Sequence, residues 1–477
     1  MQVRPEPSRL RAVFKAYDVR GVVPDELDEE MAWAVGAAFG DFVAADGAER
    51  VVVGRDMRES GAGLSRALAA GVLDRGLVVL DAGLVSTDLL YFASGELDAP
   101  GAMLTASHNP ARYNGIKLCR SGARPIGQET GLSEIRRAAE LLLARAPAPG
   151  EREKLFARGA YERVELLEAF AEHVRSFLTA ELKPLKVVAD TANGMGGLVA
   201  PAVFAKLPVH LEVMFGELDG SFPNHPADPI QPENLADLRS RILETGADVG
   251  LAFDGDADRV FLVDEKAEPL SGSLTTAIVA AAMLERHPGA TILYNLICSK
   301  AVPEVVRERG GVPVRTRVGH SFIKATMAET GAVFGGEHSG HYYFRDNFRA
   351  DSGIIAAMVT LGVMSAAGQP LSELRRPFER YADSGEINTE VGDASSVLAG
   401  VRRRFEAEGA SLDTLDGLTV DLGDWWFNLR PSNTEPLLRL NLEAADAGSC
   451  GRHLAEVLAL VEELDRRPTE GAGAESS

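Results

Sequence analysis

Residues 249–263 have the sequence VGLAFDGDADRVFLV, in which two apolar runs of strand length flank a short polar segment. That segment places carboxylates at Asp254, Asp256 and Asp258 and a guanidinium at Arg259. Three carboxylates at alternate positions on a turn can surround Mg²⁺, because this hard cation prefers oxygen ligands. The Arg could neutralise a phosphoryl group bound to the same metal. The stretch therefore predicts a strand, a metal-binding loop and a second strand.

Two other interpretations compete for the same loop. In an EF-hand the three Asp would stand at positions 1, 3 and 5, with Glu265 at position 12. Arg259 then occupies position 6, where the sharp turn needs Gly, and the flanks are strand-like instead of helical. A solvated acidic turn is the remaining alternative to metal binding.

Outward from this loop, strand-like runs alternate with helical patterns such as Leu64/Leu68/Val72 and Leu238/Ile242. The strand-like runs are Val51–Val53, Leu77–Leu80, Val187–Ala189, Val249–Phe253 and Ile292–Leu296. This alternation is typical of parallel α/β units, and polar joints at 53–56, 189–194 and 253–256 lie where open α/β sheets bind ligands. We expect several similar α/β modules.

Beyond residue 381 the pattern changes to that of an α+β unit. We expect a strand, a helix (Ser395–Glu408), paired strands (Leu418–Asp421 and Leu437–Leu442) and a last helix (His453–Leu464). A chain of 477 residues also exceeds what one core supports. The expected domains are 1–155, 156–268, 269–380 and 381–466, followed by a small, polar and flexible tail, 467–477.

Composition limits the partners. The net charge of −21 disfavours nucleic acid and anionic membranes, so a phosphate site must gather its cations locally. The three Cys are far apart without CxxC spacing, which favours a reducing compartment over disulfides or zinc. The chain has no signal-like start and no run of 18 uncharged apolar residues. We expect a soluble, cytoplasmic protein.

The segment TASHNP, residues 105–110, places Ser107 in a loop, because Pro110 disfavours helix at the preceding residue. Ser107 is a candidate phosphoryl carrier, with His108 and Lys117 near enough in sequence to assist a weak nucleophile. An ordinary turn capped by Asn109 is the alternative.

Two further motifs suit a phosphorylated polyol. GGEHSGH, residues 335–341, combines a permissive backbone with groups that bind hydroxyls, while zinc binding by His338 and His341 is the minor alternative. RPSNTEP, residues 430–436, suits a phosphate dianion, with a capped hairpin as the alternative.

Two short segments complete the set. Gly319-His320-Ser321 places an imidazole at a strand end, and Tyr17-Asp18-Val19-Arg20-Gly21 adds an early guanidinium.

With five motifs in order, the chain resembles the α-D-phosphohexomutase family, and within it the bacterial phosphomannomutase/phosphoglucomutase branch. The motifs are YDVRG (17–21), TASHNP (105–110), DGDADR (254–259), GEHSGH (336–341) and RPSNTEP (430–436). The resemblance implies four domains around a central cleft: three related α/β domains with mixed sheets and a smaller, mobile α+β domain at the C-terminus.

The resemblance also implies roles for individual residues. Ser107 resembles the phosphoserine, and Arg20 and Arg259 would support the phosphoryl group. Lys117 and His320 resemble the proton-transfer groups. The residues expected in catalysis are Ser107, Lys117, His320, Arg20 and His108. The expected metal ligands are Asp254, Asp256, Asp258 and, through a phosphoryl oxygen, Ser107. The expected substrate-binding residues are Tyr17, Arg259, Gly319, Glu337, Ser339, His341, Arg430, Ser432, Asn433 and Thr434.

The implied reaction interconverts hexose 6-phosphate and hexose 1-phosphate, of mannose and/or glucose, through a phosphoserine and a hexose 1,6-bisphosphate. Mg²⁺ is the expected cofactor, the bisphosphate an activator, hexose phosphates the partners, and a monomer or weak homodimer the expected state. A phosphoglucosamine mutase remains an alternative, although Thr105 and His338 favour mannose and glucose. A Mg²⁺-dependent sugar-phosphate phosphatase is another.

One position departs from the family pattern. Many relatives carry Lys before Cys-Ser in the third domain, where this chain has Ile297. Lys300 and Lys324 are the candidates to replace a lost phosphate or sugar contact.

Overall fold

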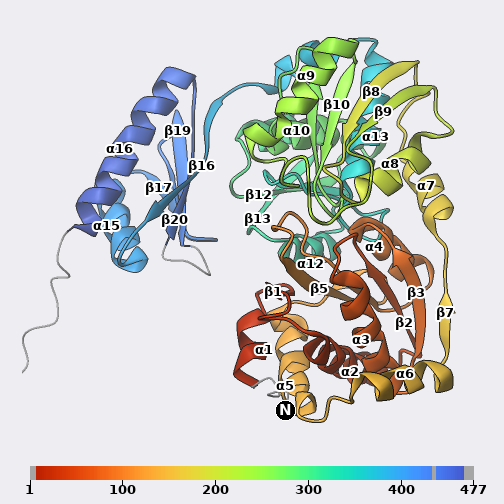
Figure 1. Ribbon diagram of the computed structural model, residues 1–477. Coiled ribbons are helices and arrows are strands. Elements are labelled where there is room, and N and C mark those ends of the chain that lie inside the picture. The colour runs from red at the N-terminus through yellow and green to blue at the C-terminus, as the bar shows by residue number, and fades with distance from the viewer. Residues whose placement is uncertain (1–6, 432–436, 467–477) are drawn as a thin grey trace, which may run out of the picture.

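Four sheets, each covered by helices, follow one another along the chain in the computed structural model, which describes residues 7–431 and 437–466 (Figure 1). The first domain contains α1 (Pro7–Val13), β1 (Val19–Val22), α2 (Glu29–Ala45), β2 (Arg50–Arg55), α3 (Gly61–Asp74), β3 (Val78–Leu84), α4 (Thr87–Glu96), β4 (Gly101–Leu104), β5 (Tyr113–Arg120), β6 (Arg124–Pro125), α5 (Leu132–Leu143), α6 (Pro149–Arg158) and β7 (Tyr161–Arg163).

The next two domains are smaller. The second contains α7 (Leu167–Arg175), β8 (Leu185–Asp190), α8 (Gly196–Phe204), β9 (Val209–Met214), α9 (Ala236–Thr245), β10 (Val249–Phe253) and β11 (Val260–Asp264). The third contains α10 (Gly272–Arg286), β12 (Thr291–Asn295), α11 (Ala301–Glu308), β13 (Val312–Thr316), α12 (His320–Thr330), β14 (Phe334–Gly336), β15 (Tyr342–Phe344), α13 (Gly353–Ala367) and α14 (Leu371–Leu374). Short 3₁₀ turns lie at Gln128–Thr130, Pro232–Leu235 and Arg376–Phe378.

The three α/β domains share one four-strand core. In each, two parallel strands lie beside a third parallel strand, which turns back through a hairpin into an antiparallel fourth strand. The spatial orders are β5-β4-β2-β3, β11-β10-β8-β9 and β15-β14-β12-β13. The first sheet adds β1 beside β5 and β7 beside β3. The sheets are therefore mixed and related, as the sequence predicts.

This shared topology places three motifs at equivalent points. The loop between the third and fourth core strands carries TASHNP after β4, DGDADR after β10 and GEHSGH after β14. Every residue of β10 and β11 is buried, as expected from the apolar runs at 249–253 and 260–263, and these strands exclude the helical flanks of an EF-hand.

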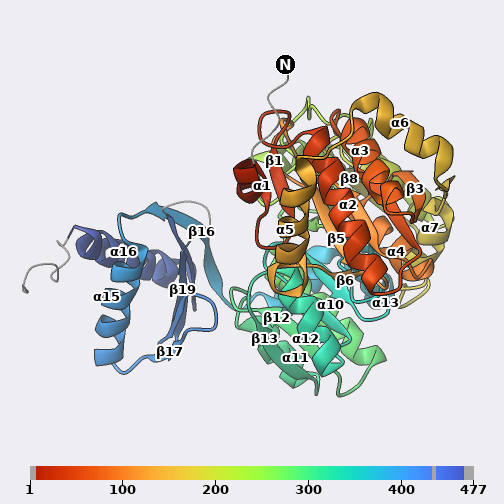
Figure 2. The same ribbon diagram turned by 90° about the horizontal axis from the view of Figure 1, so that it is seen from below.

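The C-terminal domain has a different architecture. Its antiparallel sheet has the order β16-β20-β19-β18-β17, with strands β16 (Ala382–Glu390), β17 (Ser411–Asp413), β18 (Leu418–Asp421), β19 (Trp425–Pro431) and β20 (Leu437–Ala444). Its helices α15 (Ala394–Ala407) and α16 (Ala447–Asp465) cover the outer face of the sheet, and the other face looks toward the rest of the molecule (Figures 1 and 2).

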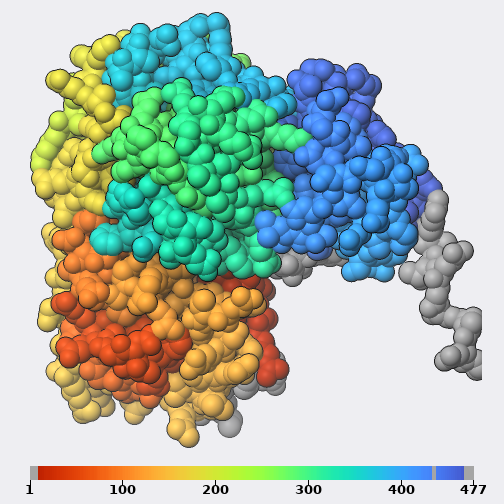
Figure 3. Space-filling model, turned by 180° about the vertical axis from the view of Figure 1, so that it is seen from behind, coloured from red at the N-terminus to blue at the C-terminus, as the bar shows by residue number. Residues whose placement is uncertain are grey.

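The apolar side chains of the described residues form several cores of unequal size. The first domain has a core of its own, around Trp33 and Leu68. One continuous core joins side chains from all three α/β domains, including Leu90, Val199 and Ile354. The buried helix α13 follows the third sheet in the chain but also packs on α7 and β11 of the second domain. The C-terminal domain has a separate core around Phe427 and Leu440. In Figure 3 this domain packs against the third domain.

Two details differ from the sequence-based expectations. The strands expected to pair in the last domain, β18 and β20, are separated by β19, which pairs with both. Strand β19 is not predicted from the sequence, because the last two residues of this strand, Arg430 and Pro431, are also the first two residues of the predicted phosphate-binding motif. Strand β7 lies beyond the boundary expected at residue 155 yet pairs with β3 of the first sheet. The domain boundaries stay predictions, and the tail 467–477 lies outside the described residues.

No single helix among the described residues is both long and apolar enough to cross a bilayer. Helix α13 reaches such a length only together with Leu371–Phe378, across a bend of 91°.

Candidate active site

The Ser107 loop and the acidic loop touch, although they are about 150 positions apart in the chain. The Ser107 hydroxyl donates to Oδ2 of Asp254 at 2.7 Å. Gly255 makes this approach possible, because a Cβ at that position would lie 2.5 Å from the Ser107 carbonyl oxygen. The first and second domains therefore contribute to one site.

Ser107 is held in an unusual backbone conformation. Its φ of +48° lies in the left-handed region, which residues other than Gly, Asn and Asp rarely adopt. The Thr105 hydroxyl accepts a hydrogen bond from the Ser107 N–H at 2.9 Å, and His108 Nδ1 lies 3.3 Å from Ser107 Oγ. The hydroxyl is thus directed at the acidic loop while an imidazole lies beside it.

The acidic triplet fits a divalent cation. Asp254, Asp256 and Asp258 are at most 1% exposed, and one carboxylate oxygen from each lies within 4.8 Å of those of the other two. Oδ1 of Asp256 and Oδ1 of Asp258 are buried without a hydrogen-bond partner among the described residues. Buried carboxylate oxygens in this state are suitable ligands for Mg²⁺.

Lys117 balances part of this negative charge. Its Nζ lies 2.9 Å from Oδ2 of Asp256 and 2.7 Å from Oδ2 of Asp258. Burial opposes the charge on Lys117, but the two carboxylates raise its pKa well above the usual range. Burial and the neighbouring carboxylates raise the pKa of Asp254, whereas Lys117 lowers that of Asp256 despite its burial.

Two guanidinium groups lie around Ser107. Arg20 Nη1 donates to the Ala106 carbonyl at 3.2 Å, and its Nη2 pairs with Asp18. Arg259 Nε donates to Oδ2 of Asp254 at 2.9 Å, the same oxygen that accepts from Ser107. The Nη2 group of Arg259 is buried without a partner among the described residues. Both predicted guanidiniums therefore lie beside the Ser loop or its carboxylate partner.

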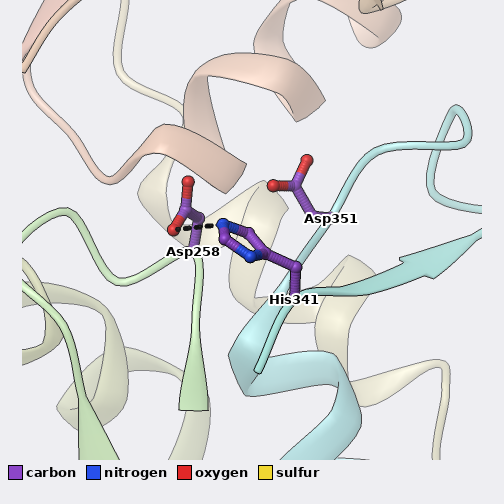
Figure 4. Close-up of side chains that lie close together, drawn as sticks. All are labelled: Asp258, His341 and Asp351. Carbon is purple, nitrogen blue, oxygen red and sulfur yellow. Dashed lines mark ion pairs between the residues drawn. The ribbon is translucent and has the colours of Figure 1, made fainter. Parts of the chain in front are cut away.

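The GEHSGH loop joins the same cluster through backbone and side chains. An isolated antiparallel bridge connects Arg259 with His341. The His341 Nε2 lies 3.7 Å from Oδ1 of Asp258 (Figure 4). The His341 Nδ1 lies 3.0 Å from the Ser339 hydroxyl. All three equivalent hairpin loops thus meet in one place.

Figure 4 shows a second group of possible metal ligands, formed by Asp258, His341 and Asp351. Cations already lie against both of its carboxylates. Lys324 Nζ is 2.7 Å from Oδ1 of Asp351, and Lys117 contacts Asp258. Lys324 lowers the pKa of Asp351 despite its burial, which keeps this carboxylate charged.

Glu337 is held firmly on the third domain. It is 2% exposed and accepts from Asn295 Nδ2 at 3.2 Å, from the Gly319 N–H at 3.1 Å and from the Tyr343 hydroxyl at 2.7 Å. The hydrogen bond from Gly319 places the segment that follows β13 next to the GEHSGH loop. His338 differs from the other loop residues, because its Nδ1 lies 3.0 Å from the Ser273 hydroxyl.

The segment around His320 connects this cluster to Tyr17. The two rings meet edge to face at 5.3 Å, and the Tyr17 hydroxyl donates to the Val318 carbonyl at 3.5 Å. Desolvation, with Lys324 and Lys117 nearby, lowers the pKa of His320 to about 3. The His320 imidazole is therefore neutral at physiological pH.

A cavity of about 680 Å³ lies beyond Tyr17, between the first, third and C-terminal domains. Five cations and one carboxylate are among its lining residues: Lys15, Arg317, Arg402, Arg430, Arg439 and Asp416. Arg430 Nη2 lies 3.1 Å from Glu386, which also pairs with Arg439 at 3.5 Å. Such an excess of positive charge suits a phosphate ligand in a chain whose net charge is −21.

The remaining predicted positions are less informative. Ser432, Asn433 and Thr434 lie outside the described residues. Ile297 is buried beside His338, at a small pocket. The candidate replacements for Lys are both engaged elsewhere, since Lys300 Nζ contacts Asp421 at 2.7 Å and Lys324 is buried against Asp351.

Sequence reasoning missed two residues that hold the site together. Thr87, at the start of α4, donates from its hydroxyl to Oδ2 of Asp256 at 2.6 Å and from its N–H to the Asp256 carbonyl at 3.0 Å. Arg58 is 1% exposed and contacts the Ser107 carbonyl. The polar joint at 53–56 was a weak signal for Arg58, whereas no local pattern marks Thr87.

Four domain models of one family match the chain in order. They describe the α/β/α domains I, II and III and the C-terminal domain of phosphoglucomutase/phosphomannomutase, at residues 11–142, 166–268, 271–381 and 386–460. Together they span most of the sequence.

Individual relatives agree with these matches. The chain is 40% identical over 439 residues to a protein named phosphomannomutase from Salmonella montevideo, covering 90% of this chain and 94% of the relative. It is 40% identical over 435 residues to a Xanthomonas campestris protein named phosphohexose mutases, with coverage of 90% and 94%. A crystal structure of a phosphoglucomutase/phosphomannomutase family protein from Burkholderia thailandensis has a TM-score of 0.84 and 32% identity, covering 96% of this chain and 98% of the other.

Proposed function

The chain belongs to the phosphoglucomutase/phosphomannomutase family and is a mutase enzyme, and we propose that it interconverts hexose 6-phosphate and hexose 1-phosphate through Ser107. Mannose and glucose are the proposed sugars. The observation that carries the proposal is the contact of Ser107 Oγ with Asp254 Oδ2 at 2.7 Å. It places a nucleophile beside a buried set of cation ligands, which phosphoryl transfer requires and simple sugar binding does not.

The acidic triplet is proposed to hold Mg²⁺ through Asp254, Asp256 and Asp258, completed by an oxygen of the phosphoryl group on Ser107. When bound, Mg²⁺ would neutralise charge that develops on the phosphoryl oxygens. Arg20 and Arg259 would stabilise the same oxygens, because both guanidiniums lie around the Ser107 loop. The chain's own contribution is mainly to position these charges before the reaction begins.

When a sugar hydroxyl takes the phosphoryl group from Ser107, the sugar oxygen loses a proton and Ser107 Oγ gains one, so the site needs a proton acceptor and a proton donor. Lys117 is the proposed acid, since its ammonium lies beside the acidic triplet and is protonated before the reaction begins. His320 is the proposed base, since its imidazole is neutral and its Nδ1 is buried without a partner among the described residues. His108 is a further imidazole beside Ser107 Oγ, at 3.3 Å, and His341 lies beside Asp258 of the acidic triplet, at 3.7 Å.

We propose that two regions recognise the substrate, the GEHSGH loop and the cation-lined cavity. Glu337, Ser339 and His341 would bind sugar hydroxyls, with Tyr17 and Gly319 shaping the passage toward the cavity. Arg430 would bind the phosphate that is not transferred, because its buried guanidinium lines the cation-rich cavity. The same phosphate is also proposed to contact Ser432, Asn433 and Thr434.

A hexose 1,6-bisphosphate is the proposed intermediate and activator. After the first transfer it must present its other phosphate to Ser107, so the far site has to accept either end of the sugar. A cavity of about 680 Å³ with cations on two walls supports such tolerance. A monomer or weak homodimer and a cytoplasmic location complete the proposal.

The test is a coupled mutase assay on mannose 1-phosphate, glucose 1-phosphate and glucosamine 1-phosphate in parallel. We expect turnover of the mannose or glucose compound that depends on Mg²⁺ and is increased by a catalytic amount of the matching 1,6-bisphosphate. Preferential turnover of glucosamine 1-phosphate would move the chain to the glucosamine branch. Release of inorganic phosphate at the rate of substrate loss would replace the mutase with a phosphatase.

A further inference from the structure

We propose that Arg58 is the positioning residue of the Ser107 loop, an assignment that rests on the proposed role of Ser107. Arg58 lies just beyond β2, and its side chain has no exposed surface. It contacts the loop only through backbone carbonyls and would touch neither the sugar phosphate nor the transferred group. Its function is to fix the backbone conformation from which Ser107 points at the acidic triplet.

The guanidinium of Arg58 donates hydrogen bonds to backbone carbonyls along the Ser107 loop. Its Nη2 donates to the carbonyls of Ser107 at 2.8 Å and Asn109 at 2.6 Å. Its Nη1 donates to the carbonyls of Pro110 and Tyr113, both at 2.9 Å. Four carbonyls over seven positions therefore converge on one side chain, which only the planar fork of Arg can satisfy together.

Arg58 is itself fixed from two sides. Its Nε lies 3.2 Å from Oδ2 of Asp56, and its own N–H donates to Oδ1 of the same carboxylate at 3.0 Å. From the second domain, the Phe222 ring lies 5.1 Å from the guanidinium carbon. A Cβ on Gly220 would lie 2.5 Å from the Arg58 Cα, so that segment packs directly over Arg58. The Arg58 guanidinium therefore has little freedom to move together with the Ser107 loop.

The loop needs such support because its conformation is not one that its residues prefer. Ser107 has a φ of +48°, and the chain must turn twice between β4 and β5. Without Arg58, buried carbonyls would lose their donor, and the loop would turn them toward water. That rotation would move Ser107 Oγ away from Asp254, although every catalytic side chain would still be present.

This mechanism predicts a specific kinetic pattern. A positioning residue that acts on the nucleophile lowers kcat, whereas binding of the sugar phosphate depends on the third and C-terminal domains and stays nearly unchanged. A displacement of about 1 Å in the reacting group can cost about 100-fold in rate. We therefore expect Arg58→Met to reduce kcat about 100-fold and to change KM less than threefold.

The matched control is Arg152→Met in the same domain. Arg152 is 5% exposed and donates to the Glu29 carboxylate at 2.9 Å and to the Glu29 carbonyl at 3.0 Å, on the side of α2. It tests the general cost of removing a buried Arg. We expect a comparable fall in melting temperature and a kcat within threefold of the unmodified enzyme.

Two further variants separate positioning from stability. Asp56→Asn/Arg58→Met removes both partners, so no unpaired carboxylate remains buried, and we expect kcat to stay low. Arg58→Lys keeps the charge and part of the hydrogen bonding, and we expect an intermediate kcat. Hydrogen exchange of residues 105–115 supplies a readout independent of activity, and both Met variants at position 58 should exchange faster there while Arg152→Met should not.

The results decide between three conclusions. Faster exchange in residues 105–115 together with a selective loss of kcat supports the proposal. A kcat within threefold in Arg58→Met or in folded Asp56→Asn/Arg58→Met, or unchanged exchange in the loop, overturns it. If the unmodified enzyme lacks mutase activity, the proposed function fails by itself, and the exchange comparison still tests whether Arg58 orders this loop.

Discussion

The junction between the Ser107 loop and the acidic loop differs sharply from the cation-lined cavity at the C-terminal domain. At the junction the three Asp are at most 1% exposed, and Ser107, Arg259 and Lys117 contact them directly. The cavity has a volume of about 680 Å³, and Glu386 is the acidic partner of both Arg430 and Arg439. One region is closed and densely paired, and the other is open.

This difference matches the two tasks of the proposed reaction. Charge stabilisation depends on groups held in place in a dry environment, where electrostatic interactions are strong. Recognition of a sugar that binds in two orientations instead needs room and a diffuse positive charge. The separate apolar core of the C-terminal domain allows its wall of the cavity to move without disturbing the junction.

The largest effect is expected from removal of the nucleophile, Ser107, at the closed junction. Ser107→Ala should lower mutase turnover by at least about 1,000-fold while leaving the melting temperature nearly unchanged. The measurement is a coupled mutase assay with the bisphosphate supplied. Ser121→Ala, whose hydroxyl contacts Asp98 in the same domain, is the control and should retain activity. Near-normal turnover of Ser107→Ala would remove this Ser from the mechanism.

Removal of one carboxylate tests whether the closed region holds a cation. Asp256→Asn should weaken divalent cation binding at least about tenfold, because a neutral amide replaces a charged oxygen ligand. Binding is measured directly by titration with Mn²⁺ and electron paramagnetic resonance. Asp264→Asn alters a carboxylate in the same hairpin that pairs with Arg375, and it should bind Mn²⁺ as the unmodified protein does. Equal affinities in both variants would contradict the assignment.

A change in the open region should act on binding instead of chemistry. Arg430→Met should raise the KM for sugar phosphate about tenfold and change kcat less than threefold, because a charged hydrogen bond contributes about 1.5–3 kcal/mol. Steady-state kinetics measures both constants. Arg403→Met changes an Arg that lines a different groove, between α15 and α16, and serves as control. A fall in kcat alone would place Arg430 with the catalytic groups.

The smallest expected effect concerns how pH acts on the closed region. Burial raises the pKa of Asp88 to about 7, and this carboxyl accepts from the Ser352 hydroxyl at 2.6 Å. A pKa raised above its unfolded value gives stability that is present at low pH and is lost as pH rises toward 7. The loss contributed by this one group is at most about 1.4 kcal/mol per pH unit.

Melting temperatures between pH 5 and 8 check this contribution. Asp88→Asn keeps the shape of the side chain without its titration, so its melting temperature should fall less over this range than that of the unmodified protein. Parallel curves for the two proteins would show that Asp88 does not titrate there.

Much of the architecture followed from local pattern. The uninterrupted apolar runs of β10 and β11 predicted buried strands, and the flanks of DGDADR excluded an EF-hand. The motifs could also be ordered along the chain, because each combines turn residues with side chains of one chemistry. The pairing of β18 with β19 was not predicted from the sequence. Strand β19 ends in Arg430-Pro431, and these two residues also begin the RPSNTEP motif, which was interpreted as a loop.

By itself, the sequence determined which residues can bind a cation, carry a phosphoryl group or bind a phosphate, because side-chain chemistry is a local property. Only the tertiary structure decided that Ser107 and Asp254 meet, that Arg58 and Thr87 support them, and that Lys300 and Lys324 are engaged elsewhere. These contacts join segments far apart in the chain. They depend on the equivalent hairpins of three sheets packing around one core, and no local pattern records that arrangement.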